Sequence, residues 1–183
     1  FFNKKLKNFR LSNIDQKIKL LSNLKVDFVI TRKFDKKFSK TKALNFISQI
    51  LNKKLSSKFI FVSNNFRFGN KREGNVNLLK KYEKLFNYKV VKPEPLIKSK
   101  KIVSSSLIRN LLENGLLNKA NNLLKRNWAI QGIVKKGRQI GKKIGFPTCN
   151  IDINDYVLAK PGVYAVKVLR KNSDKYLKGI ANL

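Results

Sequence analysis

Three consecutive serines, Ser104, Ser105 and Ser106, precede an apolar helical stretch that contains Arg109. The start of a helix presents backbone N–H groups without intrahelical partners, to which hydroxyls and a guanidinium add further donors. If Ser106 is the N-cap, Arg109 lies at N3, where its charge opposes the helix dipole by about 0.3–1 kcal/mol. A bound phosphate reverses the sign of that contribution. The residues therefore allow two interpretations, an ordinary serine N-cap and a phosphate-binding helix start.

A second group of residues combines three glycines at four-residue intervals with two oxygen-bearing side chains: Gly137, Gly141, Gly145, Thr148 and Asn150. Glycine adopts positive φ and lets the backbone approach a ligand closely. Thr148 and Asn150 alternate in an expected strand, so both can face one side, with oxygens suited to a magnesium–phosphate group. The segment is not a Walker loop, because no Ser or Thr follows its Gly-Lys pair and no helix is expected after it. A long glycine-rich turn between two strands is the alternative.

The elements that must position these residues begin with an α/β pattern. Apolar, β-rich runs at 26–30, 59–62 and 88–91 alternate with stretches of helical periodicity, one of them entered through Thr41 as N-cap. Strands separated by helices need crossover connections, which predicts a mostly parallel sheet covered by helices. In such sheets ligands bind beyond the carboxyl ends of the strands. Two further helices are expected at 104–113 and 116–124.

Helical periodicity disappears in the last third of the chain. Strands are predicted at 128–134, 163–169 and 176–181, the last two joined by a polar turn. We therefore expect two domains, an α/β domain at 1–125 and an all-β domain at 126–183.

The chain is strongly basic, with 42 basic residues against 10 acidic ones, no histidine and a net charge of +32. Lysine supplies 34 of these cations and arginine only 8, whereas proteins that read nucleic acids favour arginine. We therefore interpret the charge as the product of A/T-rich codons and do not expect a nucleic-acid partner. A basic RNA-associated module is the alternative, since neutralisation of phosphates dominates RNA affinity. The lack of histidine excludes serine triads and His-ligated zinc from these residues.

The remaining composition bears on location and completeness. A single cysteine, Cys149, fits a reducing, cytoplasmic location. No apolar run approaches the length of a membrane span, and the first residues lack the apolar core of a signal peptide, so no membrane association is expected. The chain has no methionine, even at position 1, and we expect it to be a fragment.

Four groups of motifs carry a resemblance to a known family. They are Asn65-Phe66-Arg67-Phe68-Gly69 followed by Arg72-Glu73-Gly74; Val103-Ser104-Ser105-Ser106-Leu107-Ile108-Arg109; Gly145-Phe146-Pro147-Thr148-Cys149-Asn150; and Gly162-Val163-Tyr164-Ala165-Val166 with Gly179-Ile180-Ala181-Asn182. In this order they resemble the motifs of the prokaryotic bifunctional riboflavin kinase/FMN adenylyltransferase family, also called FAD synthetase. The resemblance extends over nearly the whole chain.

The resemblance implies an α/β Rossmann-like nucleotidyltransferase domain followed by an all-β flavokinase barrel. It also implies FAD biosynthesis, in which riboflavin is phosphorylated to FMN and FMN is adenylylated to FAD. Riboflavin, FMN and ATP are then the small-molecule partners, with Mg²⁺ as cofactor and flavins as substrate and product. The oligomeric state is left open. A single-activity FMN adenylyltransferase with a noncatalytic barrel is a further alternative.

The resemblance also implies roles for individual residues. The residues that would bind the phosphates of ATP in adenylyl transfer are Ser104, Ser105, Ser106 and Arg109. Asn65 and Phe66 are placed near the flavin or nucleotide pocket. The residues that would bind ATP in the kinase step are Gly137, Gly141, Gly145, Thr148 and Asn150. Thr148 and Asn150 would also bind the metal.

The sequence departs from the family pattern in ways that affect these roles. Asn65 stands where many members have Asp, and so it keeps a polar acceptor but loses a negative charge. The family's His-x-Gly-His motif is expected upstream of Phe1, and the catalytic glutamate of its kinase downstream of Leu183. We therefore expect no catalytic residue within these 183 residues.

Overall fold

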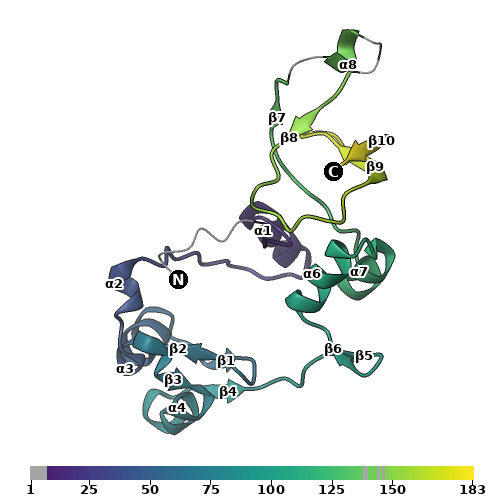
Figure 1. The fold of residues 1–183 in the computed structure, drawn as a ribbon. Coiled ribbons are helices and arrows are strands. Elements are labelled where there is room, and N and C mark those ends of the chain that lie inside the picture. Colours follow the sequence, from purple (N-terminus) through teal and green to yellow (C-terminus); the bar gives the residue numbers. More distant parts are fainter. Residues whose placement is uncertain (1–7, 138–139, 144, 146) are drawn as a thin grey trace. The chain divides into compact units, whose positions relative to one another are not determined.

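The computed structural model describes residues 8–137, 140–143, 145 and 147–183, which fall into two compact units (Figure 1). One unit is Ile30–Ile102. The other combines Phe1–Val29 with Val103–Leu183. None of the helices in the described ranges has the length and apolar composition of a membrane span.

Helices and short strands alternate in the unit Ile30–Ile102, as the sequence predicts. Its elements are α2 (Lys36–Ser39), α3 (Ala43–Asn45), the π-helix η1 (Phe46–Lys54), β1 (Phe59–Phe61), β2 (Arg67–Phe68), the 3₁₀ helix η2 (Asn70–Arg72), β3 (Gly74–Asn75), α4 (Val76–Lys81), α5 (Glu83–Phe86), β4 (Lys89–Val91), β5 (Ile97–Lys98) and β6 (Lys101–Ile102).

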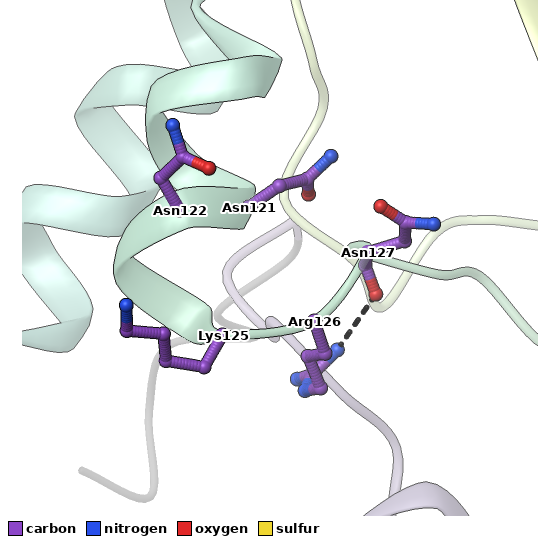
Figure 2. A pocket seen from close by; sticks show the side chains of 5 residues that line it. All are labelled: Asn121, Asn122, Lys125, Arg126 and Asn127. Carbon is purple, nitrogen blue, oxygen red and sulfur yellow. Dashed lines mark hydrogen bonds between the residues drawn. The ribbon is translucent and has the colours of Figure 1, made fainter.

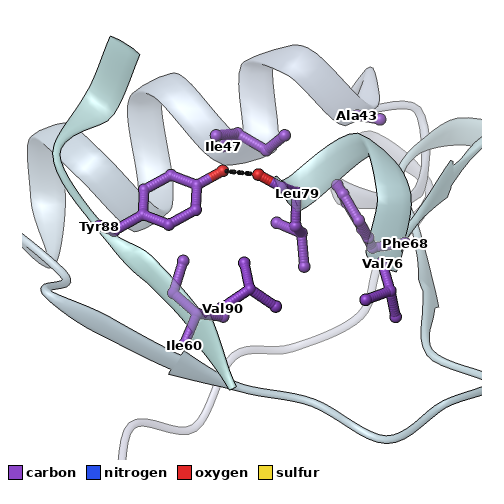
Figure 3. Packing of buried hydrophobic residues seen from close by; sticks show 8 residues of the cluster. All are labelled: Ala43, Ile47, Ile60, Phe68, Val76, Leu79, Tyr88 and Val90. Carbon is purple, nitrogen blue, oxygen red and sulfur yellow. Dashed lines mark hydrogen bonds between the residues drawn. The ribbon is translucent and has the colours of Figure 1, made fainter. Parts of the chain in front are cut away.

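A parallel pair of strands, β1 and β4, carries the predicted crossover topology. Ile60 lies opposite Val90 in this pair, and both are buried. Helix η1, which precedes β1, contributes the completely buried Ile47 to the same core, and α4, which lies between β1 and β4 in the chain, contributes Leu79. Figure 3 shows the resulting core, whose members are Ala43, Ile47, Ile60, Phe68, Val76, Leu79, Tyr88 and Val90.

The predicted strand at 26–30 is wrong. These residues have no ladder partner in the described part of the chain, and Phe28 is 86% exposed. A strand exists only by pairing with a neighbour, and a β-rich composition does not supply that neighbour.

The second unit is built around a pair of helices. Its elements are α1 (Ile14–Asn23), α6 (Ser105–Glu113), α7 (Leu117–Leu124), β7 (Val134–Lys135), α8 (Ile140–Lys143), β8 (Asn150–Ile151), β9 (Val163–Leu169) and β10 (Tyr176–Asn182). The predicted end of α6 is confirmed, with Asn114 as C-cap and Gly115 at φ +74°.

The core of this unit joins α6 and α7 to a segment from the last third of the chain. Ile108, Leu112 and Ala120 of the two helices cluster with Val157, and all four are almost completely buried. Lys160 N donates to Leu112 O at 3.0 Å. Residues on both sides of the expected domain boundary thus share one core.

The last third forms separate antiparallel pairs. β9 and β10 pair along their whole length, as predicted, and β7 pairs with β8. The strand predicted at 128–134 is reduced to Val134 and Lys135. Within the described residues these pairs do not close into a barrel, and α8 interrupts the expected all-β pattern.

Candidate functional site

The start of α6 is capped by Ser104 and not by Ser106. Ser104 Oγ accepts a hydrogen bond of 3.2 Å from Leu107 N, which makes Ser105 and Ser106 the first two residues of the helix. Arg109 consequently lies beyond the N3 position that the sequence predicts for it, and the unfavourable dipole term expected there does not apply. The exposed Ser105 and Ser106 hydroxyls make no hydrogen bond within the described residues.

Arg109 lies on the same face of α6 as the two free hydroxyls, because it follows Ser105 by four residues and Ser106 by three. Its Nε donates to Phe9 O at 2.6 Å. The other guanidinium N–H groups have no partner among the described residues. Hydroxyls, N–H groups of the first turn and a guanidinium thus share one helix end, an arrangement suited to an anion with several oxygens.

Asn65 and Phe66 belong to the other unit. Asn65 is exposed, and its Oδ1 accepts a hydrogen bond of 3.0 Å from Ser63 Oγ. The Phe66 ring stacks on Phe68, with centroids 5.5 Å apart and planes at 21°. Phe66 therefore packs against the hydrophobic core of its unit.

The rest of this motif surrounds the start of helix α3. Ala43 N donates to Glu73 Oε1 at 2.6 Å, and Asn70 N donates to Thr41 O at 2.7 Å. A Cβ built on Gly69, whose φ is +77°, lies 2.8 Å from Ala43 backbone atoms. This role of Glu73 is not predicted from the sequence, which indicates Thr41 as the N-cap. That prediction is wrong, because the N-cap of α3 is Lys42.

The hairpin of β7 and β8 brings Gly137 and Asn150 together. Lys135 lies opposite Asn150 in this pair. A Cβ built on Gly137 collides with Asn150 Nδ2, so any larger residue at 137 displaces the Asn150 amide. The close approach of its backbone to the predicted site residue Asn150 thus explains why glycine is needed at 137, one of the three predicted positions.

The other predicted residues of this loop are placed as follows. Gly141 lies in α8, where the sequence predicts a loop. Gly145 has φ +83°, and no atom of the described residues beyond its chain neighbours lies within 4 Å of a built Cβ. Thr148 is exposed and precedes β8, so the prediction that Thr148 and Asn150 alternate within one strand is wrong. Part of the predicted loop, at 138–139, 144 and 146, lies outside the described residues.

An ion pair connects β7 to the residue that follows β8. Lys135 Nζ lies 2.8 Å from Asp152 Oδ2. The hydrogen bond from Lys135, followed by one from Asn154 N, lowers the pKa of Asp152 below its usual value. Because both side chains are largely exposed, this pair stabilises the hairpin little.

Thr148 and Asn150 can offer a metal ion only neutral oxygen ligands, a hydroxyl and an amide oxygen. In the described ranges there is no group of three His, Cys, Asp or Glu side chains that could enclose a metal ion. Mg²⁺ commonly keeps several waters and binds through the phosphates of a nucleotide with one or two protein oxygens. An exposed hydroxyl and an exposed amide fit that mode of binding.

An open polar pocket of about 360 Å³ lies at the end of α7 and contains none of the predicted site residues (Figure 2). It is lined by Asn121, Asn122, Lys125, Arg126 and Asn127. Burial lowers the pKa of Arg126, whose Nη2 donates to Ser12 Oγ at 3.1 Å. Since cations are favoured at the C-terminal end of a helix, Lys125 and Arg126 have a structural explanation there.

Comparison with protein families gives two matches in sequence order. The FAD synthetase family matches residues 1–107, which include the three serines and end before Arg109. The riboflavin kinase family matches residues 124–183.

Individual relatives agree with these matches. The bifunctional riboflavin kinase/FMN adenylyltransferase of Buchnera aphidicola from Schizaphis graminum is 40% identical over 184 residues, which cover 100% of this chain and 59% of that protein. Its Escherichia coli K12 counterpart is 37% identical over 95% of this chain and 55% of that protein.

A solved structure, described as a macrolide-efflux protein from Streptococcus pneumoniae, has a TM-score of 0.76 at 25% identity, over 94% of this chain and 55% of that one. The chain spans somewhat more than half the length of these relatives. Because a single family match covers more than half of its residues, the chain belongs to the FAD synthetase family.

Proposed function

We propose that the protein makes FAD from riboflavin in two ATP-dependent steps. In the first step, the riboflavin 5′-hydroxyl attacks the γ-phosphate of ATP, which yields FMN and ADP. In the second, the FMN phosphate attacks the α-phosphate of another ATP, which yields FAD and pyrophosphate. The observation that carries this proposal is the pair of family matches in one chain, in the order shared with relatives named as bifunctional enzymes.

In adenylyl transfer, the start of α6 would bind ATP phosphates. Ser105 and Ser106 supply hydroxyls that no other described residue engages, and Arg109 supplies a positive charge on the same helix face. Ser104 contributes chiefly by capping the helix, which orients the N–H groups of the first turn. These groups stabilise charge and position the nucleotide, and none of them needs to act as a base.

In the kinase step, Thr148 and Asn150 would bind the phosphates of ATP together with Mg²⁺. When bound, the metal neutralises charge on the phosphate oxygens. Gly137 keeps the space next to the Asn150 amide free, and Gly141 and Gly145 would let the loop backbone approach the phosphates. We assign Asn65 and Phe66 to the edge of the flavin or nucleotide pocket, where the exposed Asn65 amide is available to a ligand.

The domain arrangement is part of the same proposal. Residues 1–125 would belong to a Rossmann-like nucleotidyltransferase domain and residues 126–183 to a flavokinase barrel. The parallel pair β1–β4 and the antiparallel pairs β7–β8 and β9–β10 support these two architectures. A cytoplasmic location, where ATP is made, remains a prediction.

The deciding experiment incubates the full-length natural protein with riboflavin and MgATP and separates the flavins by chromatography. Formation of both FMN and FAD is expected. Thr148→Ala and Asn150→Ala should lower FMN formation from riboflavin and leave FAD formation from added FMN unchanged. If both steps survive these substitutions, the assigned kinase residues are wrong.

Two further outcomes would replace the proposal. FAD formation from FMN without any FMN formation from riboflavin identifies a single-activity adenylyltransferase with a noncatalytic barrel. Absence of flavin turnover, together with tight RNA binding that weakens steeply with salt, identifies an RNA-associated module.

A further inference from the structure

Residues 9–11 run between α6 and the segment 154–157, and all three of their carbonyls accept hydrogen bonds. Phe9 O accepts from Arg109 Nε at 2.6 Å and Arg10 O from Val157 N at 2.9 Å. Leu11 O accepts from the Trp128 indole N–H at 3.0 Å. A short stretch of backbone is thereby fixed from three sides.

The segment 154–157 contributes most of the backbone contacts in this arrangement. Asn154 O accepts from Asn8 N at 3.0 Å, and Asp155 O accepts from Arg10 N at 2.9 Å. Arg10 and Tyr156 form a parallel bridge. Val157 is completely buried against α6 and α7, which anchors the segment in the core.

Tyr156 strengthens the anchor from its other side. It is 3% exposed, and its hydroxyl lies 2.9 Å from Gln16 Oε1 and 3.1 Å from both Gln131 O and Gln131 N. A buried hydroxyl with satisfied partners tolerates little displacement. The backbone next to Tyr156 is therefore rigid enough to fix the position of Phe9 O.

We propose that segment 154–157, which lies within the part of the chain that matches riboflavin kinase, positions Arg109 for ATP binding through the carbonyl of Phe9. This inference rests on the role proposed above for Arg109. The Phe9 carbonyl fixes Nε and so orients the guanidinium plane, which leaves its other N–H groups to a phosphate. The kinase-matching segment is then a positioning element of the adenylyl-transfer site.

The test is a matched pair of substitutions in the full-length natural protein. Arg10→Pro removes the N–H that donates to Asp155 O, whereas Arg10→Ala keeps it. Both substitutions remove the exposed 3.8 Å ion pair with Asp155 and the contact of the Arg10 guanidinium with the Phe9 ring, so only the N–H distinguishes them. We expect Arg10→Pro to raise the KM for ATP in adenylyl transfer about tenfold, because a charged hydrogen bond loses its fixed acceptor. Arg10→Ala should stay within about twofold of the wild type.

A double-mutant cycle distinguishes positioning from general damage. If Arg10→Pro acts through Arg109, adding it to Arg109→Ala should cause no further loss of adenylyl transfer. Riboflavin phosphorylation should be kept in all these variants. Additive losses, or a parallel loss of both activities, would overturn the positioning inference alone. An Arg109→Ala variant with unchanged adenylyl transfer would overturn the proposed role of Arg109 and the inference with it.

A second pair of substitutions, with smaller effects on the backbone, tests the inference if the Arg10→Pro variant does not fold. Asp155→Gly loosens the backbone of the positioning segment, and Asp155→Ala removes the same side chain without that freedom. Glycine should raise the KM for ATP about threefold more than alanine does. Equal KM values for the two variants would overturn the inference.

Discussion

Ala43 N, at the start of helix α3, donates a 2.6 Å hydrogen bond to Glu73, which lies 30 residues further along the chain. The local N-cap residue, Lys42, makes no side-chain hydrogen bond to the helix. Glu73 therefore satisfies a helix-start N–H group that the adjacent sequence leaves open, and its negative charge is favourable at that end of the helix. The Arg72-Glu73-Gly74 motif thus has a structural role in this unit.

Glu73→Ala should lower the free energy of unfolding of this unit by about 1–2 kcal/mol, the usual cost of a lost helix cap. Glu73→Gln keeps an acceptor oxygen and should lose about half as much. Amide hydrogen exchange gives the most local measurement, because the Ala43 N–H should lose protection first in Glu73→Ala. Unchanged protection at Ala43 in that variant would contradict the capping role.

The sequence predicts where the helices of this unit lie more accurately than it predicts their capping residues and their hydrogen-bonding geometry. The helical stretch predicted after Thr41 exists, and Ala43 and Ile47 within it are buried. The cap supplied by Glu73 depends on a contact between distant segments, which local residue preferences do not encode. Helix η1 also departs from α geometry, since Leu55 N donates to Ile50 O, five residues back.

The alkaline stability of the unit should depend on Tyr88. Burial, followed by the charge of Glu83, raises the pKa of Tyr88 to about 12, and its hydroxyl donates to Leu79 O at 2.6 Å (Figure 3). Below pH 10 the side chain is protonated in both folded and unfolded states. Between about pH 10 and 12 only the unfolded state releases the proton, so stability falls by up to about 1.4 kcal/mol per pH unit.

The matched variant is Tyr88→Phe, which should lose about 1 kcal/mol near neutral pH with the hydroxyl hydrogen bond. Its urea unfolding midpoint should then fall less steeply than that of the wild type between pH 10 and 12. Parallel curves for the two proteins would show that Tyr88 does not cause the alkaline loss.

The predicted strand at 128–134 fails for a physical reason visible in its hydrogen bonds. Trp128 N donates to Asn121 Oδ1 at 2.7 Å, and Gln131 N donates to the Tyr156 hydroxyl at 3.1 Å. Backbone donors that are used by side chains cannot form a ladder. The alternating strands β9 and β10 were predictable because a short polar turn brings each next to its partner.

The three serines at the start of α6 should separate into one with a structural role, the N-cap Ser104, and two that bind ligand, Ser105 and Ser106. Ser104→Ala removes the cap on Leu107 N and should cost about 1 kcal/mol of stability in addition to any loss of adenylyl transfer. Ser106→Ala removes a hydroxyl that has no partner in the described part of the chain, so it should raise the KM for ATP with little change in Tm. Ser106→Thr keeps the hydroxyl and should restore the KM. Equal thermal destabilisation by Ser104→Ala and Ser106→Ala would contradict this division.

Gly137→Ala should impair the kinase step selectively. A Cβ at this position collides with Asn150 Nδ2. Because this amide is at the end of a flexible side chain, the amide moves while the hairpin keeps its fold. We expect the KM for MgATP in riboflavin phosphorylation to rise about tenfold, because a displaced ligand group positions phosphate poorly.

The matched control for that substitution is Gly145→Ala in the same loop. Its φ of +83° makes alanine cost about 1 kcal/mol of backbone strain, but a Cβ there meets no described residue within 4 Å beyond its chain neighbours. Gly145→Ala should therefore lower Tm slightly without the tenfold rise in KM. Adenylyl transfer from added FMN should be unchanged in both variants, because α6 carries the groups assigned to that step. If both alanines raise the KM equally, general loop strain, and not displacement of Asn150, accounts for the effect.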